Sequence, residues 1–322
     1  MIKDLVIDCH ADTLMRKYFE NMIPPLGSGK KLKFHVTKDF LNRGGVNIQV
    51  FAIFIPPKFE KLGVEITLEM ISLARGMEKE GFILIKSQTD MKRIKENKKD
   101  NVGMILSLEG TVALERNQLL PIFHELGVRN IGLSWSRKNL FCEGVMFPER
   151  NIEGEGLSIH GKELVEQMET LGLMVDVSHL NEKGFSDVVK MATKPFIASH
   201  SNAYQLCQVI RNLKDDQLMQ IASADGVVGI NFCTAFLTNK NAKHASINDV
   251  IQHIVYIAEL IGVEYVGLGS DFDGIVITPK GLENASKMKN IPPLLEKEGF
   301  SRQDIAKIMG GNFQRVFNKV WK

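Results

Sequence analysis

The segment Leu106-Ser107-Leu108-Glu109 ends an apolar strand pattern on a carboxylate, and three other segments end on a metal-ligand side chain in the same way. These are Asp8-Cys9-His10-Ala11-Asp12, Asp176-Val177-Ser178-His179 and Ile197-Ala198-Ser199-His200. Apolar runs that are buried on both faces indicate a parallel sheet, and donors at one end of its strands converge in space although they are scattered along the sequence. Together the segments supply three imidazoles and two carboxylates, which predicts a metal-dependent hydrolase.

Eight short segments have the composition of buried strands, because they are rich in aliphatic and β-branched residues and are mostly bounded by Gly, Pro or Asn. Amphipathic stretches lie between them, for example Ile159 to Leu171, which Gly172 can cap at its C-terminus. Alternating strands and helices are typical of α/β architecture. The predicted strands are Leu5 to Asp12, Val46 to Phe54, Val102 to Glu109, Asn130 to Ser136, Leu173 to His179, Pro195 to His200, Val227 to Cys233 and Tyr265 to Asp271.

The number and length of these units favour a (β/α)8 TIM-like barrel. Eight units occupy about 270 residues, and such barrels typically take about 250. An open Rossmann-type sheet is the competing prediction, but no GxGxxG follows the first strand, and polar residues end five different strands rather than one switch point. Since only a closed ring brings five such ends together, we expect a single catalytic barrel domain over residues 1–322.

The composition is that of a large globular chain without a nucleic-acid signature. The 322 residues are 44% hydrophobic and 24% charged, with a formal net charge of +2. The chain can therefore bury a large core, and its basic excess is too small to indicate nucleic-acid binding. No apolar stretch approaches the roughly 18 residues that span a bilayer, and no signal-peptide core is present. Four widely spaced cysteines suit reduced thiols. We therefore expect a cytoplasmic protein that binds neither nucleic acid nor a membrane.

Each candidate metal ligand has a structural alternative when it is taken alone. His10 and Asp12 are two residues apart on a strand and point to one face, but Asp12 could instead cap the following helix. Glu109 could be ion-paired, whereas a bridge between two cations would satisfy both of its oxygens. His179 and His200 end successive strands, where a lone histidine is more often a core residue. Their occurrence in register with the other donors favours metal ligands.

The order of these motifs resembles the renal (membrane) dipeptidase family of zinc peptidases. The similarity covers almost the whole chain, because the candidate ligands are followed by Val209-Ile210-Arg211-Asn212, Gly269-Ser270-Asp271-Phe272-Asp273-Gly274 and Gly310-Gly311-Asn312-Phe313. The resemblance implies a barrel of the amidohydrolase type with two zinc ions per chain, bridged by a glutamate. It also implies hydrolysis of dipeptides, including those with a D-residue at the C-terminal position.

The resemblance assigns roles residue by residue. Arg211 corresponds to the arginine that binds the free carboxylate of the dipeptide, which a guanidinium fork suits better than lysine, and its alternative is a solvated arginine at a helix start. Asp271 corresponds to the aspartate that handles the proton, with Asp273 as the nearby alternative. The two zinc ions are assigned to His10, Asp12 and Glu109, and to Glu109, His179 and His200.

The chain departs from the family at Trp135. Animal members carry a histidine in a Thr-His motif after strand four, where this chain has Leu133-Ser134-Trp135-Ser136. Indole donates one N–H and carries no charge, so the departure bears on substrate range and rate rather than on the metals. Trp135 is a candidate substrate-binding residue, with plain packing as its alternative. Animal members are also secreted, lipid-anchored and disulfide-linked, which nothing in this sequence predicts.

The mechanism we expect is attack on the peptide carbonyl by a hydroxide that bridges the two zinc ions, with Asp271 carrying the proton. Two other functions stay open. A related barrel hydrolase could act on a cyclic amide, a lactone or a phosphoester, although many such relatives have HxH on strand one and a carboxylated lysine as the bridge. The other is a catalytically silent metal-binding partner protein. The preferred dipeptide, the physiological metal and a possible homodimer are not determined by the sequence.

Overall fold

The structure is a computed structural model that describes residues 5–20, 33–96, 101–115, 119–145, 154–239 and 242–321. Its strands are short apolar runs buried on both faces, as expected of a parallel sheet that helices cover on the outside. The strands of the described residues are β1 Ile7–Ala11, β2 Ile48–Phe54, β3 Phe82–Leu84, β4 Val102–Glu109, β5 Val128–Gly132, β6 Met174–Asp176, β7 Ile197–Ala198, β8 Val227–Ile230 and β9 Val266–Leu268.

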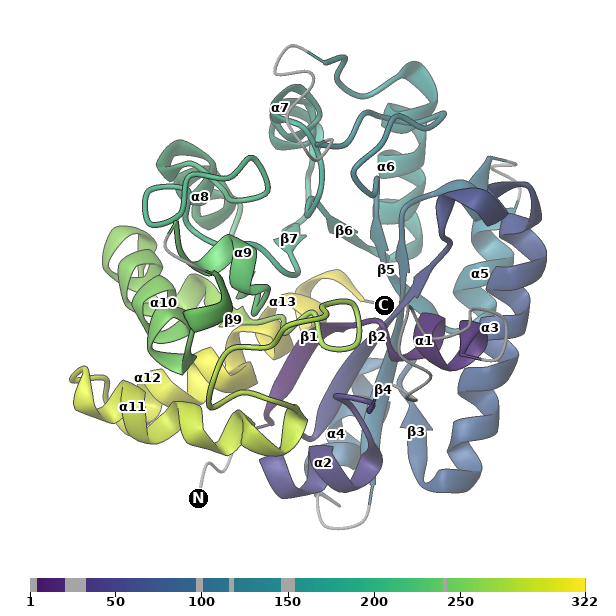
Figure 1. Cartoon of the computed structure of the whole chain (residues 1–322). Coiled ribbons are helices and arrows are strands. Elements are labelled where there is room, and N and C mark those ends of the chain that lie inside the picture. The colour runs from purple at the N-terminus through teal and green to yellow at the C-terminus, as the bar shows by residue number, and fades with distance from the viewer. Residues whose placement is uncertain are drawn as a thin grey trace.

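Eight of these strands follow one another around a nearly closed parallel barrel, in the order β1-β2-β4-β5-β6-β7-β8-β9 (Figure 1). Strand β3 lies outside this ring and pairs with β4. The ring closes between β1 and the residues after β9, because the Asp12 amide donates to the Phe272 carbonyl over 2.9 Å and the Asp271 amide donates to the His10 carbonyl over 3.1 Å. The predicted (β/α)8 TIM-like fold is confirmed.

Helices alternate with the strands and surround the barrel (Figure 1). Helix α6 has its predicted bounds because local signals fix both ends: the Ser158 hydroxyl accepts from the Gly161 amide, and Gly172 ends the helix in the left-handed conformation. The α-helices of the described residues are α1 Thr13–Phe19, α2 Lys38–Gly44, α3 Gly63–Met77, α4 Gln88–Glu96, α5 Leu120–Leu126, α6 Ile159–Leu171, α7 Glu182–Met191, α8 Asp215–Ser223, α9 Thr234–Leu237, α10 Ile247–Ile261, α11 Ile291–Lys297, α12 Arg302–Ala306 and α13 Asn312–Val320.

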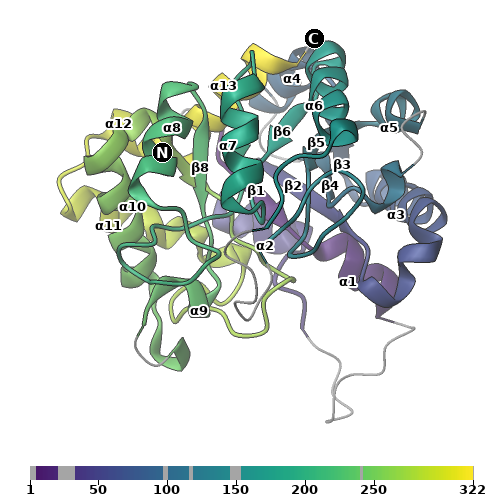
Figure 2. The ribbon, with the colours of Figure 1, turned by 90° about the horizontal axis from the view of Figure 1, so that it is seen from above.

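The two ends of the barrel differ in chemistry. One buried apolar cluster joins several strands to α13, whose Phe313 ring occupies space that Gly267 leaves free: a Cβ on Gly267 would lie 2.4 Å from that ring. Helices α13 and α4 lie together at this end (Figure 2), where the Gln88 side chain donates to the Asn318 carbonyl over 2.8 Å. Helices α1 and α9, which follow the carboxyl ends of β1 and β8, lie at the opposite end (Figure 2). The carboxyl ends of the strands, which carry the candidate ligands, therefore lie at the end of the barrel where α1 and α9 are found.

All eight predicted strands are present, although several bounds differ. Strand β4 has the predicted bounds, but β5 ends at Gly132 rather than Ser136, and β7 is only two residues long. The apolar pattern continues past the last paired residue because residues such as Leu133 and Val177 are buried in the loops over the barrel mouth. Burial therefore extends further along the chain than strand pairing does.

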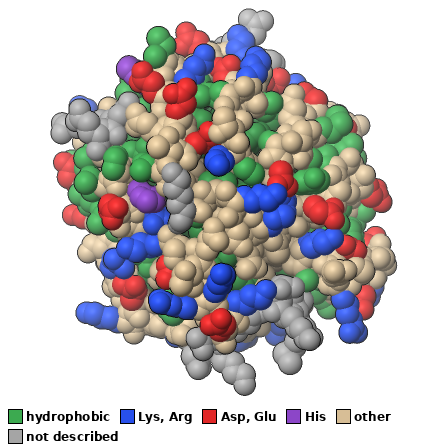
Figure 3. All heavy atoms as spheres, turned by 180° about the vertical axis from the view of Figure 1, so that it is seen from behind, with side chains coloured by type: hydrophobic (Ala, Val, Ile, Leu, Met, Phe, Trp, Pro, Cys, Tyr) green, Lys and Arg blue, Asp and Glu red, His purple; other side chains and the backbone are tan. Residues whose placement is uncertain are grey.

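The surface shows no bias in charge on the side seen in Figure 3, where basic and acidic side chains of the described residues are interspersed. Among the described helices, none has both the length and the apolar character that crossing a membrane requires. The cysteines are all free, and Cys9 is fully buried as a core residue.

Candidate metal centre

The five candidate ligands converge at the carboxyl end of the barrel, although they come from four separate segments. His10 lies in β1 and Glu109 ends β4, while Asp12, His179 and His200 lie just beyond β1, β6 and β7. The side chain of His179 is 10% exposed, and those of the other four are less exposed. Groups this polar are buried only with a compensating partner, so the cluster requires one.

Glu109 lies at the centre of the cluster and presents one oxygen to each side. Its Oε2 atom lies 3.6 Å from His10 Nε2, and its Oε1 atom lies 3.1 Å from His179 Nε2 and 3.6 Å from His200 Nε2. The carboxylate is therefore shared between two sets of donors, which adjoin each other because the His10 and His200 rings stack with their centroids 3.7 Å apart.

The donors around His179 and His200 fit a single small cation. Their Nε2 atoms lie 2.9 Å apart, and tetrahedral zinc with bonds of about 2.0 to 2.1 Å holds its donors about 3.3 Å from one another. The Nδ1 atom of His179 lies 2.9 Å from the Ser136 hydroxyl, and that of His200 lies 2.7 Å from the Ser199 hydroxyl. Because the serines engage Nδ1, each ring presents Nε2 to the cluster.

The donors around His10 also fit a cation, because two of their buried atoms have no other partner. His10 Nε2 lies 3.5 Å from Asp12 Oδ2, yet His10 Nε2 and Asp12 Oδ1 have no hydrogen bond within the described part of the chain. Asp12 occupies the N-cap position of α1, but its side chain makes no capping hydrogen bond. The helix-cap alternative therefore does not account for this carboxylate. Donor atoms of His10, Asp12 and Asp271 all lie within 4.8 Å of one another.

The two sets of donors differ in electrostatics. Burial, and then the charge of Glu109, raise the pKa of Asp12 well above its usual value. Burial opposes the charged form of His10, but the neighbouring carboxylates raise the pKa of His10 well above 6.5. Burial and then Arg211 lower the pKa of His179 to about 4. The first set thus carries negative charge that a proton or a cation must balance, whereas the second presents neutral imidazole, the form that binds metal.

Asp271 lies beside the ligands in a strained backbone conformation. Its φ is +62°, which is uncommon for a residue other than glycine. The Asn231 side chain donates to Asp271 Oδ2 over 2.9 Å, and burial raises the pKa of Asp271. Gly274 is required nearby, since a Cβ there would lie 2.2 Å from Asp12 Oδ2 and 2.7 Å from Asp271 Oδ1. The turn after β9 therefore packs against both carboxylates.

Asp273, the alternative to Asp271, has a different environment. Its carboxylate is fully buried and accepts hydrogen bonds from the Thr13 hydroxyl at 2.7 Å, from Arg16 at 3.0 Å and from the His35 amide at 2.7 Å. These contacts join the turn after β9 to α1 and to the residues around His35. Asp273 thus has structural partners, and Asp271 is the aspartate next to the candidate ligands.

Arg211 is buried beside the ligands, so a solvated arginine at a helix start is the wrong description. It lies in the loop between β7 and α8 and is 5% exposed. Its guanidinium donates to the His200 carbonyl over 3.1 Å and to the Ser201 hydroxyl over 3.4 Å, while Nε has no hydrogen-bond partner among the described residues. A buried guanidinium with a free donor can bind a carboxylate.

Trp135 forms part of the wall above His179. Its ring centroid lies 4.7 Å from that of Phe54 and 6.0 Å from that of His179, and the Arg137 guanidinium lies 5.8 Å from the indole centroid. The residue lies in the loop after β5 and is only partly buried. Trp135 therefore packs against other side chains and also lies next to His179 of the ligand cluster.

Several residues of the site were not identified from the sequence. Asn231 positions Asp271, and the hydroxyls of Ser136 and Ser199 engage the two histidine rings. A serine or an asparagine just beyond a strand has no distinctive spacing, so no local pattern pointed to these three. Gly274 belongs to a motif that the sequence did single out, but its close contact with two carboxylates depends on the fold.

A buried cluster of imidazoles and carboxylates at the carboxyl end of a parallel barrel defines the class of metal-dependent barrel hydrolases. The family model of the membrane dipeptidases, peptidase family M19, matches residues 1–322. The chain belongs to this family and is thus an enzyme of a metallo-dipeptidase family.

Individual relatives agree with this placement. A metallopeptidase from Rhodobacter sphaeroides, solved with a phosphinate mimic of the dipeptide L-Ala-D-Ala, is similar in fold with a TM-score of 0.88, 28% identity and coverage of 99% of both chains. An uncharacterised dipeptidase of Schizosaccharomyces pombe is 31% identical over 98% of this chain and 80% of its own length. The dipeptidase tcpJ of Claviceps purpurea is 36% identical over 68% of this chain, which spans 52% of that protein.

Proposed function

We propose that the protein is a dipeptidase that uses two zinc ions, and that its substrates include dipeptides with a D-residue at the C-terminal position. The observation that carries the proposal is the central position of Glu109, with one carboxylate oxygen toward His10 and the other toward His179 and His200. A shared carboxylate of this kind suits two cations better than one, because a single cation would leave one set of buried donors without a partner.

The ligand assignment follows the two sets of donors. His10, Asp12 and Glu109 would hold one ion, and Glu109, His179 and His200 the other. Ions held by these residues would supply Lewis acidity, which would lower the pKa of the attacking water and polarise the scissile carbonyl. Asp271 would take the proton of the attacking water and deliver it to the leaving amine, since its carboxylate lies at the edge of the cluster and Asn231 holds it there.

Arg211 would bind the substrate's free carboxylate. Its buried guanidinium donates to the His200 carbonyl, and its Nε has no hydrogen-bond partner among the described residues. Because an internal peptide bond has no carboxylate one residue away, this contact would restrict the reaction to short peptides. The dipeptide mimic bound by the Rhodobacter sphaeroides relative ends in a D-residue, which supports the same stereochemistry here.

Trp135 would contact the substrate beside the second ion without taking part in proton transfer, since indole cannot carry a proton to the leaving group. We also propose that the catalytic unit is one barrel domain over the whole chain, and that the enzyme is cytoplasmic, because its free and mostly buried thiols suit a reducing compartment. The family placement favours this activity over a cyclic-amide, lactone or phosphoester hydrolase and over a silent partner protein.

A panel of dipeptides tests the proposal. Purified protein should hydrolyse free L,L and L,D dipeptides, should lose this activity on chelation and should regain it on addition of zinc. Tripeptides and C-terminally amidated dipeptides should be poor substrates. Metal-dependent hydrolysis of a cyclic amide or a lactone without any dipeptide turnover would contradict the proposal.

A further inference from the structure

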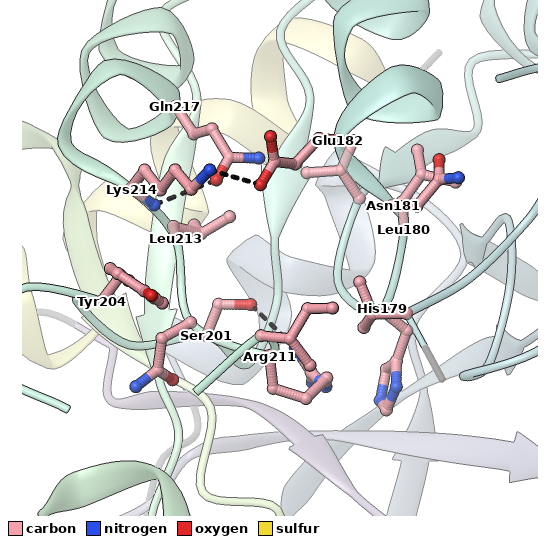
Figure 4. Close-up of a pocket in the computed structure, with 14 residues that line it drawn as sticks. His179, Leu180, Asn181, Glu182, Ser201, Tyr204, Arg211, Leu213, Lys214 and Gln217 are labelled. Carbon is pink, nitrogen blue, oxygen red and sulfur yellow. Dashed lines mark hydrogen bonds and ion pairs between the residues drawn. The ribbon is translucent and has the colours of Figure 1, made fainter. Parts of the chain in front are cut away.

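A pocket opens beside Arg211 and His179 and extends away from the metal ligands. It lies between the start of α7 and the start of α8, and its wall includes both of these residues, so it is continuous with the candidate active site. Figure 4 shows His179 and Arg211 at one end of the pocket and Lys214 and Glu182 at the other. A substrate carboxylate on Arg211 would place the rest of its own residue at the mouth of this pocket.

The walls of the pocket combine an apolar lining with a charged far end. Val177, Ile210 and Leu213 contribute apolar surface next to Arg211. At the far end the Lys214 ammonium contacts Glu182 Oε1 at 2.6 Å, and both side chains are about half exposed, at 46% and 51%. An apolar stem with a charged group at its end would match this distribution.

The wall of the pocket contains two basic side chains, Arg211 and Lys214, and one acidic side chain, Glu182. Helices α7 and α8 both begin at it, and the amino-terminal end of a helix carries a partial positive charge. Lys214 has three donor hydrogens, of which the contact with Glu182 uses one. Asp215 and Asp216, in the first turn of α8, do not line the pocket, although the charge of Asp216 also acts on Lys214; the Asp215 carboxylate accepts from the Tyr256 hydroxyl at 2.9 Å. Glu182 is the acidic side chain in the wall, and Lys214 already neutralises it.

We propose that this pocket, defined here as the C-terminal side-chain pocket, receives the side chain of the substrate's C-terminal residue and prefers an acidic one. The inference rests on the proposed function, because it takes the substrate carboxylate to be bound at Arg211. An incoming side-chain carboxylate can share the Lys214 ammonium with Glu182 and faces two helix amino-terminal ends. An incoming ammonium group would have to displace Lys214 from Glu182 and would face the same positive ends, so it is disfavoured.

Three isosteric or near-isosteric substrates measure this preference. The experiment compares kcat/KM for alanyl dipeptides that end in Glu, Gln or Lys, in both stereochemical forms. The Glu to Gln ratio should be about two- to fivefold in the wild-type enzyme, because the ion pair at the pocket's far end is partly exposed. The Lys peptide should be the poorest of the three.

Substitutions at the charged pair should move this ratio in opposite directions. Lys214→Met should bring the Glu to Gln ratio close to one, and Lys214→Glu should reverse it. Glu182→Gln should raise the ratio, since it removes the competing carboxylate and leaves the ammonium. Lys190→Met is the matched control: Lys190 is exposed near the other end of α7, about 12 Å further along the helix, and the ratio should stay at the wild-type value.

The outcomes separate the inference from the proposed function. Equal turnover of the Glu and Gln peptides, or a ratio that Lys214→Met leaves unchanged, would overturn the C-terminal side-chain pocket while the dipeptidase activity stood. Absence of turnover on all three dipeptides, together with activity on another substrate class, would overturn both. A reversed ratio in Lys214→Glu with a raised ratio in Glu182→Gln would support the pocket.

Discussion

The two halves of the ligand cluster are built in different ways. In the first half, His10 and Asp12 come from one short segment at the end of β1, and two of their donor atoms have no hydrogen-bond partner among the described residues. In the second half, His179 and His200 follow different strands, and a serine hydroxyl contacts each ring at Nδ1. His179 also has a φ of +68°, so its position depends on a strained turn.

This difference indicates a division of roles. Asp271 adjoins the first half, where burial and then the charge of Glu109 raise the pKa of Asp12, and burial also raises the pKa of Asp271. A carboxylate whose pKa is raised in this way is suited to proton transfer. Arg211 adjoins the second half, where burial and then the charge of Arg211 lower the pKa of His179. We therefore expect changes in the first half to act on the chemical step and changes in the second half to act on substrate or metal binding.

The largest effect is expected at Asp271. If it carries the proton, Asp271→Asn should lower kcat by roughly 10²-fold to 10⁴-fold while both metals stay bound. The measurement is steady-state turnover of a dipeptide alongside elemental analysis of the variant. Asp273→Asn is the matched control. It should lower the thermal midpoint of unfolding, because it weakens a buried hydrogen-bond network, and it should keep a higher kcat than Asp271→Asn. Loss of metal in Asp271→Asn would make Asp271 a ligand instead.

Arg211 should show a different kinetic signature. Arg211→Lys should lower kcat/KM for free dipeptides by about 10-fold to 150-fold, corresponding to about 1.5 to 3 kcal/mol for a charge-assisted contact. The same substitution should have little effect on C-terminally amidated dipeptides, which lack the charged partner. Exposed Arg43 provides a control through Arg43→Lys, which should leave both substrates unaffected. Equal rates on free and amidated dipeptides in the wild-type enzyme would contradict the role of Arg211.

Strand patterns in the sequence predicted the candidate ligands that lie on or next to strands, and the eight strands of the ring, but not all of the strand bounds. The two-residue spacing predicted that His10 and Asp12 point to one face, and their side chains do meet at 3.5 Å although Asp12 lies just beyond β1. The uniform burial of β4 gave Val102–Glu109 its predicted bounds. Strand β5 was misplaced at its start because Arg129 resembles a loop residue. Its side chain in fact donates hydrogen bonds to the backbone carbonyls of Lys86 and His124.

The positions of loop residues were beyond sequence interpretation. The contact of Asn231 with Asp271, 40 residues away, follows from the ring order of β8 and β9, which no local pattern specifies. Strand β3 was missed because it lies outside the ring, so that neither the count of eight units nor a candidate ligand at its end pointed to it. Local periodicity thus predicts the strands and the ligands on them, whereas the loop residues that orient the ligands depend on the assembled barrel.

A smaller effect is expected where serine supports the second half. Ser199→Ala should lower the affinity for one of the two ions by about 10-fold to 100-fold, since it removes the hydroxyl that orients His200. Competition with a chelator should then show one weakened ion and one of wild-type affinity. Ser223→Ala, at an exposed position of α8, is the control and should change neither. Simultaneous loss of both ions at the same chelator concentration would show that the halves are not independent.

The smallest effect is expected at Trp135. Because indole carries no charge at the reacting atoms, Trp135→Phe should change KM by a few fold and leave kcat nearly unchanged. The ring of phenylalanine can still pack against Phe54, so the fold should be retained. A large fall in kcat at constant KM would show that the indole N–H stabilises the transition state.

The number of metal ions per chain, measured in the wild-type enzyme and in Glu109→Gln, tests the account most directly. The shared carboxylate predicts two zinc ions per chain after reconstitution of the wild-type enzyme. It also predicts weakened binding of both ions in Glu109→Gln, because the amide loses the charge that faces both sets of donors. Elemental analysis that finds a single ion in the fully active wild-type enzyme, or two tightly bound ions in Glu109→Gln, would contradict the account.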